Sequence, residues 1–114
     1  MILDEIKFEE FLKVDIRVGE ILEATINKKA KKSAYILKID FGSEIGIKTS
    51  SAQITQNYTP KDLIGKQICA VVNFAPLRVG GVKSEVLVLA VVCKKNGTVL
   101  ITPDKKVLNG EKIA

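Results

Sequence analysis

The sequence predicts a small all-β barrel of five strands, with a short helix at its start and another between the third and fourth strands. Apolar and polar residues alternate over long stretches, which is the period of a strand with one buried face. Two later apolar runs are continuous, at Gln67–Phe74 and Glu85–Val92. Glycine, proline and asparagine separate these runs as turn residues do. At 114 residues the chain has the size of one domain, which we expect to span residues 1–114.

The first elements follow from a change of period. Phe8, Phe11 and Leu12 stand at helical spacing, which predicts a short N-terminal helix. From Val14 to Ile26 the even positions are mostly apolar, which predicts a long strand with that face buried. Gly19 lies near the middle of this strand and indicates a bend or bulge that lets the strand curl around a barrel.

The second and third strands are predicted to form a hairpin. The second strand turns four alternating residues inward, namely Tyr35, Leu37, Ile39 and Phe41. After a turn at Gly42, the third strand is expected to face inward through Ile45, Ile47 and Thr49. Residues 50–58 then read as a connection with some helical character.

The second half of the chain supplies the remaining elements. Thr59 is a helix cap with Pro60 in the first turn, and Gly65 stops the helix after a single turn. The two continuous apolar runs predict strands buried on both faces. The pair Asn96-Gly97 predicts a tight hairpin near the end of the chain. Five strands with a helix between the third and fourth form the plan of an OB-fold.

Composition excludes several classes of function. Apolar residues make up 46% and charged residues 27%, and no apolar run approaches the roughly 18 residues of a membrane span. The first residues do not resemble a signal peptide, so we expect a cytoplasmic protein that does not insert into membranes. The chain has no histidine, its Cys69 and Cys93 lack a metal-binding spacing, and its carboxylates form no motif. We therefore expect no metal, no cofactor and no catalysis.

Charge is distributed unevenly along the chain. Residues 1–23 carry seven acids and three bases, a net charge of −4, whereas residues 24–114 carry six acids and fifteen bases, a net charge of +9. Four lysines fall within the five residues of the Lys28–Lys32 loop. Such a cluster suits a phosphate backbone, whose bound counterions are released on contact. An acidic peptide would also suit it, and a solvated loop without a partner is the alternative.

Three polar seams interrupt the apolar chain at strand ends, in residues 50–53, 73–76 and 83–85. If these ends meet in space, they form a polar floor bordered by cations, with Arg78 able to grip a carboxylate or phosphate bidentately. The candidate residues for binding a peptide or RNA are Lys28, Lys29, Lys31, Lys32, Lys48, Ser50, Ser51, Gln53, Asn73, Arg78, Lys83, Ser84 and Glu85.

Each seam residue also has a purely structural interpretation. The serines near residue 50 could cap a following helix, and Asn73 could stabilise its turn. Glu85, at the edge of an apolar strand, is expected to pair either with Arg17 or with backbone amides. Stacking on aromatic rings is the usual way in which single strands bind OB-folds, yet only Tyr58 and Phe74 are candidates for exposure. Peptide binding or recognition of RNA backbone and shape therefore remain open.

Five motifs resemble the CsaA family, one of the tRNA-binding domains related to the C-terminal module of methionyl-tRNA synthetase. The similarity runs from Phe8 to the end of the chain, and the motifs are specific together rather than singly. They are Lys13–Gly19, Ile39–Gly42, Lys48–Thr55, Val71–Phe74 and Ser84–Leu89. The last is similar to the CsaA branch, because synthetase-attached relatives usually have a Ser-Gln-Gly-Met-like sequence there. The chain departs from the family at Ala75, where proline is common. It also departs in the Lys28–Lys32 loop, which is more purely basic than the family's usual mix of proline, glutamate and arginine.

The resemblance implies an OB-fold homodimer without catalysis that acts as a chaperone and binds extended segments of unfolded, export-bound preproteins. The related domains bind tRNA through the same barrel, so a free-standing tRNA-binding protein is the alternative. The exposed edges of a small barrel and the apolar tail Val107-Leu108 also favour pairing with a second copy.

Overall fold

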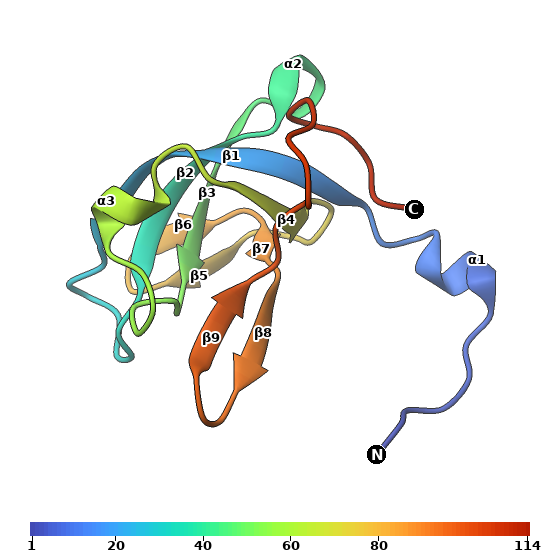
Figure 1. Ribbon diagram of the computed structural model, residues 1–114, viewed down its shortest axis with the longest axis horizontal. Coiled ribbons are helices and arrows are strands. Elements are labelled where there is room, and N and C mark those ends of the chain that lie inside the picture. Colours follow the sequence, from blue (N-terminus) through green and yellow to red (C-terminus); the bar gives the residue numbers. More distant parts are fainter.

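A computed structural model describes residues 1–114. Five antiparallel strands form one sheet in the order β3-β2-β1-β4-β7, and the sheet curls into a nearly closed barrel (Figure 1). The five strands are β1 (Ile16–Ile26), β2 (Tyr35–Asp40), β3 (Ile47–Ala52), β4 (Gln67–Val71) and β7 (Leu87–Val88). The predicted five-stranded barrel of the OB type is therefore confirmed.

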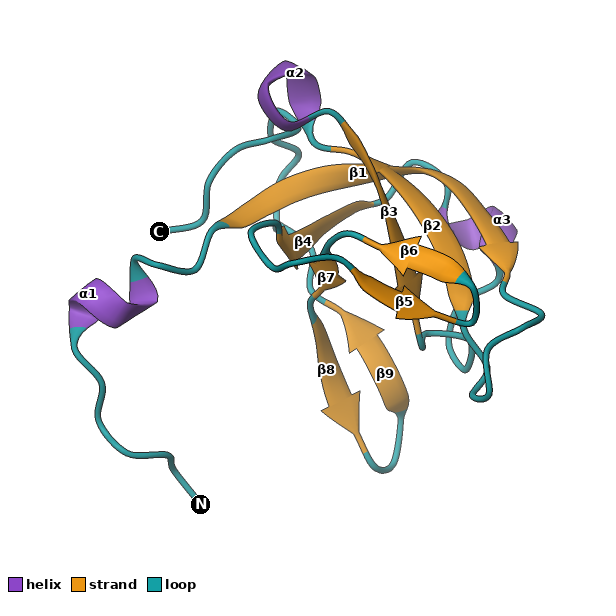
Figure 2. Ribbon diagram, turned by 180° about the vertical axis from the view of Figure 1, so that it is seen from behind, coloured by secondary structure: helices purple, strands orange, loops and turns teal.

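Two hairpins and three single-turn helices decorate the barrel. The helices are α1 (Phe8–Phe11), α2 (Gly42–Ile45) and α3 (Pro60–Leu63). One hairpin joins β5 (Leu77–Val79) to β6 (Val82–Ser84), and the other joins β8 (Ala90–Cys93) to β9 (Gly97–Leu100). Figure 2 shows β5 and β6 lying across the barrel, whereas β8 and β9 project away from it, as does the N-terminal segment with α1. None of the helices is both long and apolar enough to cross a membrane.

Helix α3 forms where the sequence predicts it, between the third and fourth strands of the barrel. The Thr59 hydroxyl accepts a hydrogen bond from the Asp62 amide at 3.3 Å, and Pro60 occupies the first turn. Gly65 follows with a φ of +87°, a conformation that glycine adopts without steric cost. Helix α1 is shorter than its spacing suggests, because none of its residues is buried and no packing extends it beyond one turn.

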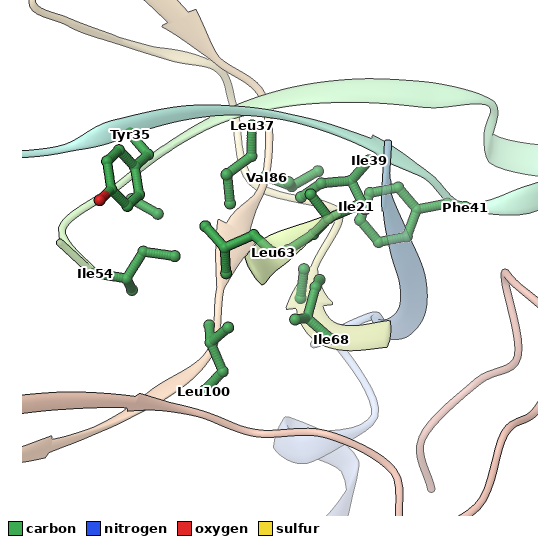
Figure 3. Close-up of a cluster of buried hydrophobic side chains, with 12 residues drawn as sticks. Ile21, Tyr35, Leu37, Ile39, Phe41, Ile54, Leu63, Ile68, Val86 and Leu100 are labelled. Atoms are coloured by element: carbon green, nitrogen blue, oxygen red, sulfur yellow. The ribbon is translucent and has the colours of Figure 1, made fainter. Parts of the chain in front are cut away.

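The core fills the barrel with one cluster of twelve buried side chains (Figure 3). Strand β2 contributes Tyr35, Leu37 and Ile39, and Phe41 follows directly after it, as predicted from their alternation. The Tyr35 hydroxyl donates a hydrogen bond to the Tyr58 carbonyl at 2.7 Å, so its polar end is satisfied inside the barrel.

The predicted inward face of β1 was wrong before the bulge and at Leu22 and Ile26, although Ala24 packs against the core as predicted. Ile21, at an odd position, is fully buried in the core cluster, whereas Leu22 and Ile26 are exposed. The bulge lies at Leu22, between Ile21 paired with Ile39 and Glu23 paired with Lys38, and not at Gly19. Because the bulge inserts one residue, the inward positions change parity along the strand. Gly19 serves close packing instead, since it faces Ile39 and the Phe41 ring.

Two further predictions about strand faces were wrong. Strand β3 continues to Ala52 and turns Ser50 and Ala52 inward, whereas Ile47 is 58% exposed. The run Glu85–Val92 is not one strand buried on both faces, because it divides into β7 and β8, and Val92 on the projecting hairpin is 86% exposed. Of the run Gln67–Phe74, residues Gln67–Val71 form a strand buried throughout, as predicted, whereas Phe74 lies beyond the strand and is exposed.

The C-terminal segment pairs with the edge of the first half of β1 that β4 leaves free. The Gly110 amide donates to the Val18 carbonyl at 2.7 Å, and the Val18 amide donates to the Glu111 carbonyl at 2.9 Å. The buried Gln67 side chain holds the backbone of Val107 through both its nitrogen, at 2.6 Å, and its oxygen, at 3.1 Å. The main chain of the tail therefore pairs with its own barrel, while the Leu108 side chain stays exposed.

We predict that Gly19→Ala destabilises the fold by about 1–3 kcal/mol, the usual cost of overpacking a core. A β-carbon there would lie 2.6 Å from both the Ile39 side chain and the Phe41 ring. Urea unfolding at fixed protein concentration measures the effect. Thr25→Ala, at an exposed position of the same strand, is the control and should cost less than about 1 kcal/mol. Equal losses in the two variants would contradict close packing at Gly19.

Candidate functional site

Two of the three polar seams meet and close the barrel between β3 and residues 84–86. The Ser51 amide donates to the Ser84 hydroxyl at 3.0 Å, and the Thr49 amide donates to the Glu85 carboxylate at 3.0 Å. The Glu85 amide donates to the Thr49 carbonyl at 2.7 Å. We call this contact of Thr49–Ser51 with Ser84–Val86 the closure seam. Its polar groups satisfy one another, so little of their hydrogen-bonding capacity is left for a ligand.

Ser50 and Glu85 are structural members of this seam. Ser50 is fully buried, and its hydroxyl donates to the Val86 carbonyl at 3.1 Å. The second carboxylate oxygen of Glu85 lies 3.8 Å from the Lys48 ammonium. Of the two partners expected for Glu85, the structure has the backbone amide and not Arg17.

Arg17 belongs to a separate cluster at the start of β1. Its guanidinium lies 2.6 Å from the Asp15 carboxylate and 3.1 Å from that of Glu44, and it also donates to the Gly110 carbonyl. The hydrogen bond to Asp15 is the main cause that raises the pKa of Arg17 above its usual value. This cluster ties the C-terminal segment to β1.

The third seam has a different role, because Asn73 anchors the connection from α1 to β1. Its side-chain nitrogen donates to the Lys13 carbonyl at 2.7 Å, and its side-chain oxygen accepts from the Asp15 amide at 2.9 Å. The two bonds span a distance of 58 to 60 residues in sequence. The side chain therefore holds a distant segment of backbone rather than its own turn.

An apolar hollow of about 380 Å³ lies beside the closure seam. Its lining includes Phe74 and Leu77, which are 54% and 67% exposed, together with Leu87 and the buried Val86. Ser84 and Glu85 supply its polar edge, and Ala75 completes the lining. Exposed apolar side chains gathered around one concavity are the usual form of a surface that binds apolar groups.

A basic hollow of about 440 Å³ lies on the other side of the β5–β6 hairpin. Lys29, Lys31, Lys32, Gln53 and Arg78 line it, so the structure brings the basic loop and Arg78 together. None of these cations forms an ion pair, since the ion pairs of the chain involve only Arg17, Lys38 and Lys48. Unpaired cations around a concavity attract anions.

Asn27, which was not among the sequence candidates, positions the basic loop. This buried side chain donates to the Val79 carbonyl at 3.2 Å and accepts from the Lys29 amide at 3.2 Å. Gly80 makes the contact possible, because a β-carbon there would lie 2.7 Å from the Ala30 backbone nitrogen. The only sequence signal was an asparagine at the end of a strand next to lysines, which is also common in ordinary turns.

The remaining candidates lie apart from the hollows or at their margins. Lys28 is exposed but does not line the basic hollow, and Lys83 lies opposite Arg78 in the β5–β6 register. Of the two aromatic candidates, Phe74 is exposed, whereas the Tyr58 hydroxyl accepts from the Leu100 amide and its ring packs against the core. Nowhere do three or more histidine, cysteine or acidic side chains gather in a way that could hold a metal ion.

The barrel, its apolar hollow and its basic hollow define a small binding domain of the OB type that offers apolar contact at one place and positive charge at another. The model of the family described as putative tRNA binding domain matches residues 16–112. The chaperone CsaA of Bacillus anthracis is 51% identical, with a TM-score of 0.92 over 97% of this chain and 100% of that one. The CsaA chaperone protein of Picrophilus torridus is also 51% identical, with a TM-score of 0.91 over 96% of this chain and 100% of that one. The chain belongs to the tRNA-binding domain family and, within it, to the CsaA proteins.

Longer proteins contain the same domain. The methionine–tRNA ligase of Parabacteroides distasonis is 38% identical over 112 residues, which are 98% of this chain and 16% of the ligase. The chain spans about a sixth of the length of the curated relatives that it matches.

We predict that Glu85→Ala destabilises the protein by about 1–3 kcal/mol, because it leaves the part-buried Thr49 amide without its partner. Glu85→Gln keeps an acceptor for this amide and should therefore lose clearly less stability than Glu85→Ala. Urea unfolding of both variants measures the difference. If the two variants lose equally, the charge facing Lys48, and not the backbone bond, would be the stabilising element.

Proposed function

We propose that this protein is a binding protein without catalysis that holds unfolded polypeptides, as a chaperone for chains bound for export. The single observation that carries this function is the apolar hollow, around which Phe74, Leu77 and Leu87 stand exposed. The 51% identity to chaperones named CsaA over nearly the whole chain supports it. The proposed location is the cytoplasm, where Cys69 and Cys93 would remain the free thiols that they are here.

The chemistry of the hollow suits an apolar side chain of an extended segment. Burying one leucine- or phenylalanine-sized side chain is worth about 1.5–3 kcal/mol before the costs of association. A hollow of about 380 Å³ has room for such a side chain, and its lining has few polar groups that would demand a particular sequence. Binding is therefore expected to be weak at each hollow and tolerant of sequence, as a chaperone requires.

The protein is further proposed to act as a homodimer. Met1, Ile2 and Leu3 are almost fully exposed, and the segment that carries them projects from the barrel (Figures 1 and 2). The β8–β9 hairpin also projects, its strands pair only with each other, and Val91 and Val92 are exposed on it. Apolar surface and unpaired strand edges of this kind favour contact with a second copy. Two copies would present two apolar hollows to one long chain, and this raises the overall affinity.

We predict that the protein slows the aggregation of a chemically denatured test protein diluted into buffer, measured by light scattering. The double variant Phe74→Ser/Leu77→Ser should lose this effect and should bind an unfolded chain at least about fivefold more weakly, because it removes apolar contact area. Ile64→Ser is the matched control, since Ile64 is exposed but lies outside the hollow. If the parent neither slows aggregation nor binds denatured chains, the proposed function is wrong.

We predict that sedimentation gives twice the mass of the 12.5 kDa chain for the parent. Val92→Asp should sediment as the single chain, because a buried unpaired carboxylate opposes the contact between copies. Ile64→Asp introduces the same charge at an exposed position away from the hairpin and should leave the mass unchanged. A parent that sediments as a single chain would contradict the dimer.

A second candidate function is tRNA binding, which the basic hollow favours. Three lysines and Arg78 line this hollow without a carboxylate partner, and the family is described by tRNA binding. Each neutralised phosphate releases condensed counterions, so binding through such cations falls steeply with salt. With about four phosphate contacts, log K against log salt should have a slope of about −3 on single strands and about −4 on a duplex.

We predict that Lys29→Ala/Lys31→Ala/Lys32→Ala reduces the magnitude of this slope by about 2 and weakens tRNA binding, as measured by filter binding at several salt concentrations. The control Lys61→Ala/Lys66→Ala/Lys105→Ala removes the same charge from exposed positions outside both the basic hollow and the β8–β9 hairpin. Unchanged binding by the first variant, or equal weakening by both, would exclude a specific role for the hollow.

A further inference from the structure

The β5–β6 hairpin separates the two hollows, and no residue lines both. Leu77 and Ser84 line the apolar hollow, whereas Arg78, Val79 and Gly80, toward the turn, line the basic hollow. Leu77 and Arg78 are neighbours in β5, so their side chains point to opposite faces of the ribbon.

The register of the hairpin gives each face a consistent chemistry. Leu77 pairs with Ser84, and both line the apolar hollow. Arg78 pairs with Lys83, which places a second cation on the opposite face. These two of the three cross-strand pairs make one face of the hairpin apolar and the other basic. The third pair, Val79 with Val82, lies at the turn, where Val79 contributes an apolar side chain to the lining of the basic hollow.

The two hollows suit different ligands. The apolar hollow contains one carboxylate, Glu85, whose oxygens already face the Thr49 amide and Lys48. A phosphate placed there would meet a like charge. The basic hollow has no acidic lining residue, and its cations are unpaired, which suits the regularly spaced charges of a phosphodiester backbone.

The hairpin is anchored at both ends, so a ligand on one face need not move it. At its turn, Asn27 holds the Val79 carbonyl at 3.2 Å. At the end of β6, the Ser84 hydroxyl holds the Ser51 amide at 3.0 Å. Because the hairpin is fixed at both ends, we expect a ligand bound on one face to cause little movement of the other face.

We propose that the two hollows are independent sites, and that one protomer holds an unfolded polypeptide segment and an RNA phosphate backbone at the same time. The identity of the polypeptide ligand rests on the proposed function. The consequence is a protein that tethers an unfolded chain to RNA, rather than one that exchanges one ligand for the other.

The test measures the Kd of a fluorescent peptide without net charge, rich in leucine and phenylalanine, in the absence and presence of saturating unfractionated tRNA. If the sites are independent, the peptide Kd should change less than about twofold. A peptide without net charge interacts only weakly with the salt-screened charge of bound tRNA. Sedimentation should then show peptide and tRNA moving with the protein in one complex. A peptide Kd that rises in proportion to tRNA concentration would overturn the proposal, as would a parent that binds no tRNA.

Two neighbouring residues make the variants that separate the sites. Leu77→Ser should weaken the peptide about fivefold and leave tRNA binding unchanged, whereas Arg78→Ala should weaken tRNA about fivefold and leave the peptide unchanged. Leu77→Ile and Arg78→Lys should restore most of the respective binding. If Leu77→Ser loses both ligands and Leu77→Ile regains both, the two ligands share one site and the proposal is wrong. The same holds for Arg78→Ala and Arg78→Lys. A parent that binds tRNA but no peptide would instead refute the proposed polypeptide function and leave the RNA site standing.

Discussion

The fold depends on the closure of the barrel between β3 and residues 84–86, which have no regular strand ladder between them. Four hydrogen bonds make the closure, and three of them use side chains, those of Ser50, Ser84 and Glu85. Each bond is worth roughly 0.5–1.5 kcal/mol net, but leaving one of these part-buried groups unpaired costs more than making the bond gains. Closure therefore requires polar residues at these positions.

This closure determines where ligands have room to bind. The polar groups of the seam are engaged with one another, so we propose that ligands bind on the surfaces on either side of the β5–β6 hairpin. One surface is apolar and is built from Phe74 and Leu77, and the other is basic and is built from Lys29, Lys31, Lys32 and Arg78. The hairpin is held in place by the seam through Ser84 and by the basic loop through Asn27. The same bonds thus shape the barrel and set the two surfaces apart.

The sequence predicted the strand count, the position of α3 and the inward face of β2, because alternation and capping residues are local signals. It mispredicted the faces of β1 and β3. The bulge at Leu22 shifts the parity of β1, and Ser50 points inward because its hydroxyl donates a hydrogen bond to the Val86 carbonyl, which is distant in sequence. The sequence could not place Arg78 beside the basic loop, and it did not identify Asn27. Both depend on contacts between residues about fifty positions apart. Local patterns carry no information about such contacts.

Chemical-shift mapping of backbone amides during titration with an apolar peptide tests most directly the central claim that ligands bind beside the closure seam and not on it. The account predicts that the largest changes fall on Phe74, Leu77 and Leu87, which line the apolar hollow, while the amides of Ser50 and Lys31 change little. Changes centred on Ser50 and Ser51, with loss of the slow hydrogen exchange expected for their amides, would contradict it. Such a result would mean that the peptide opens the seam and that the barrel closure itself is the binding site.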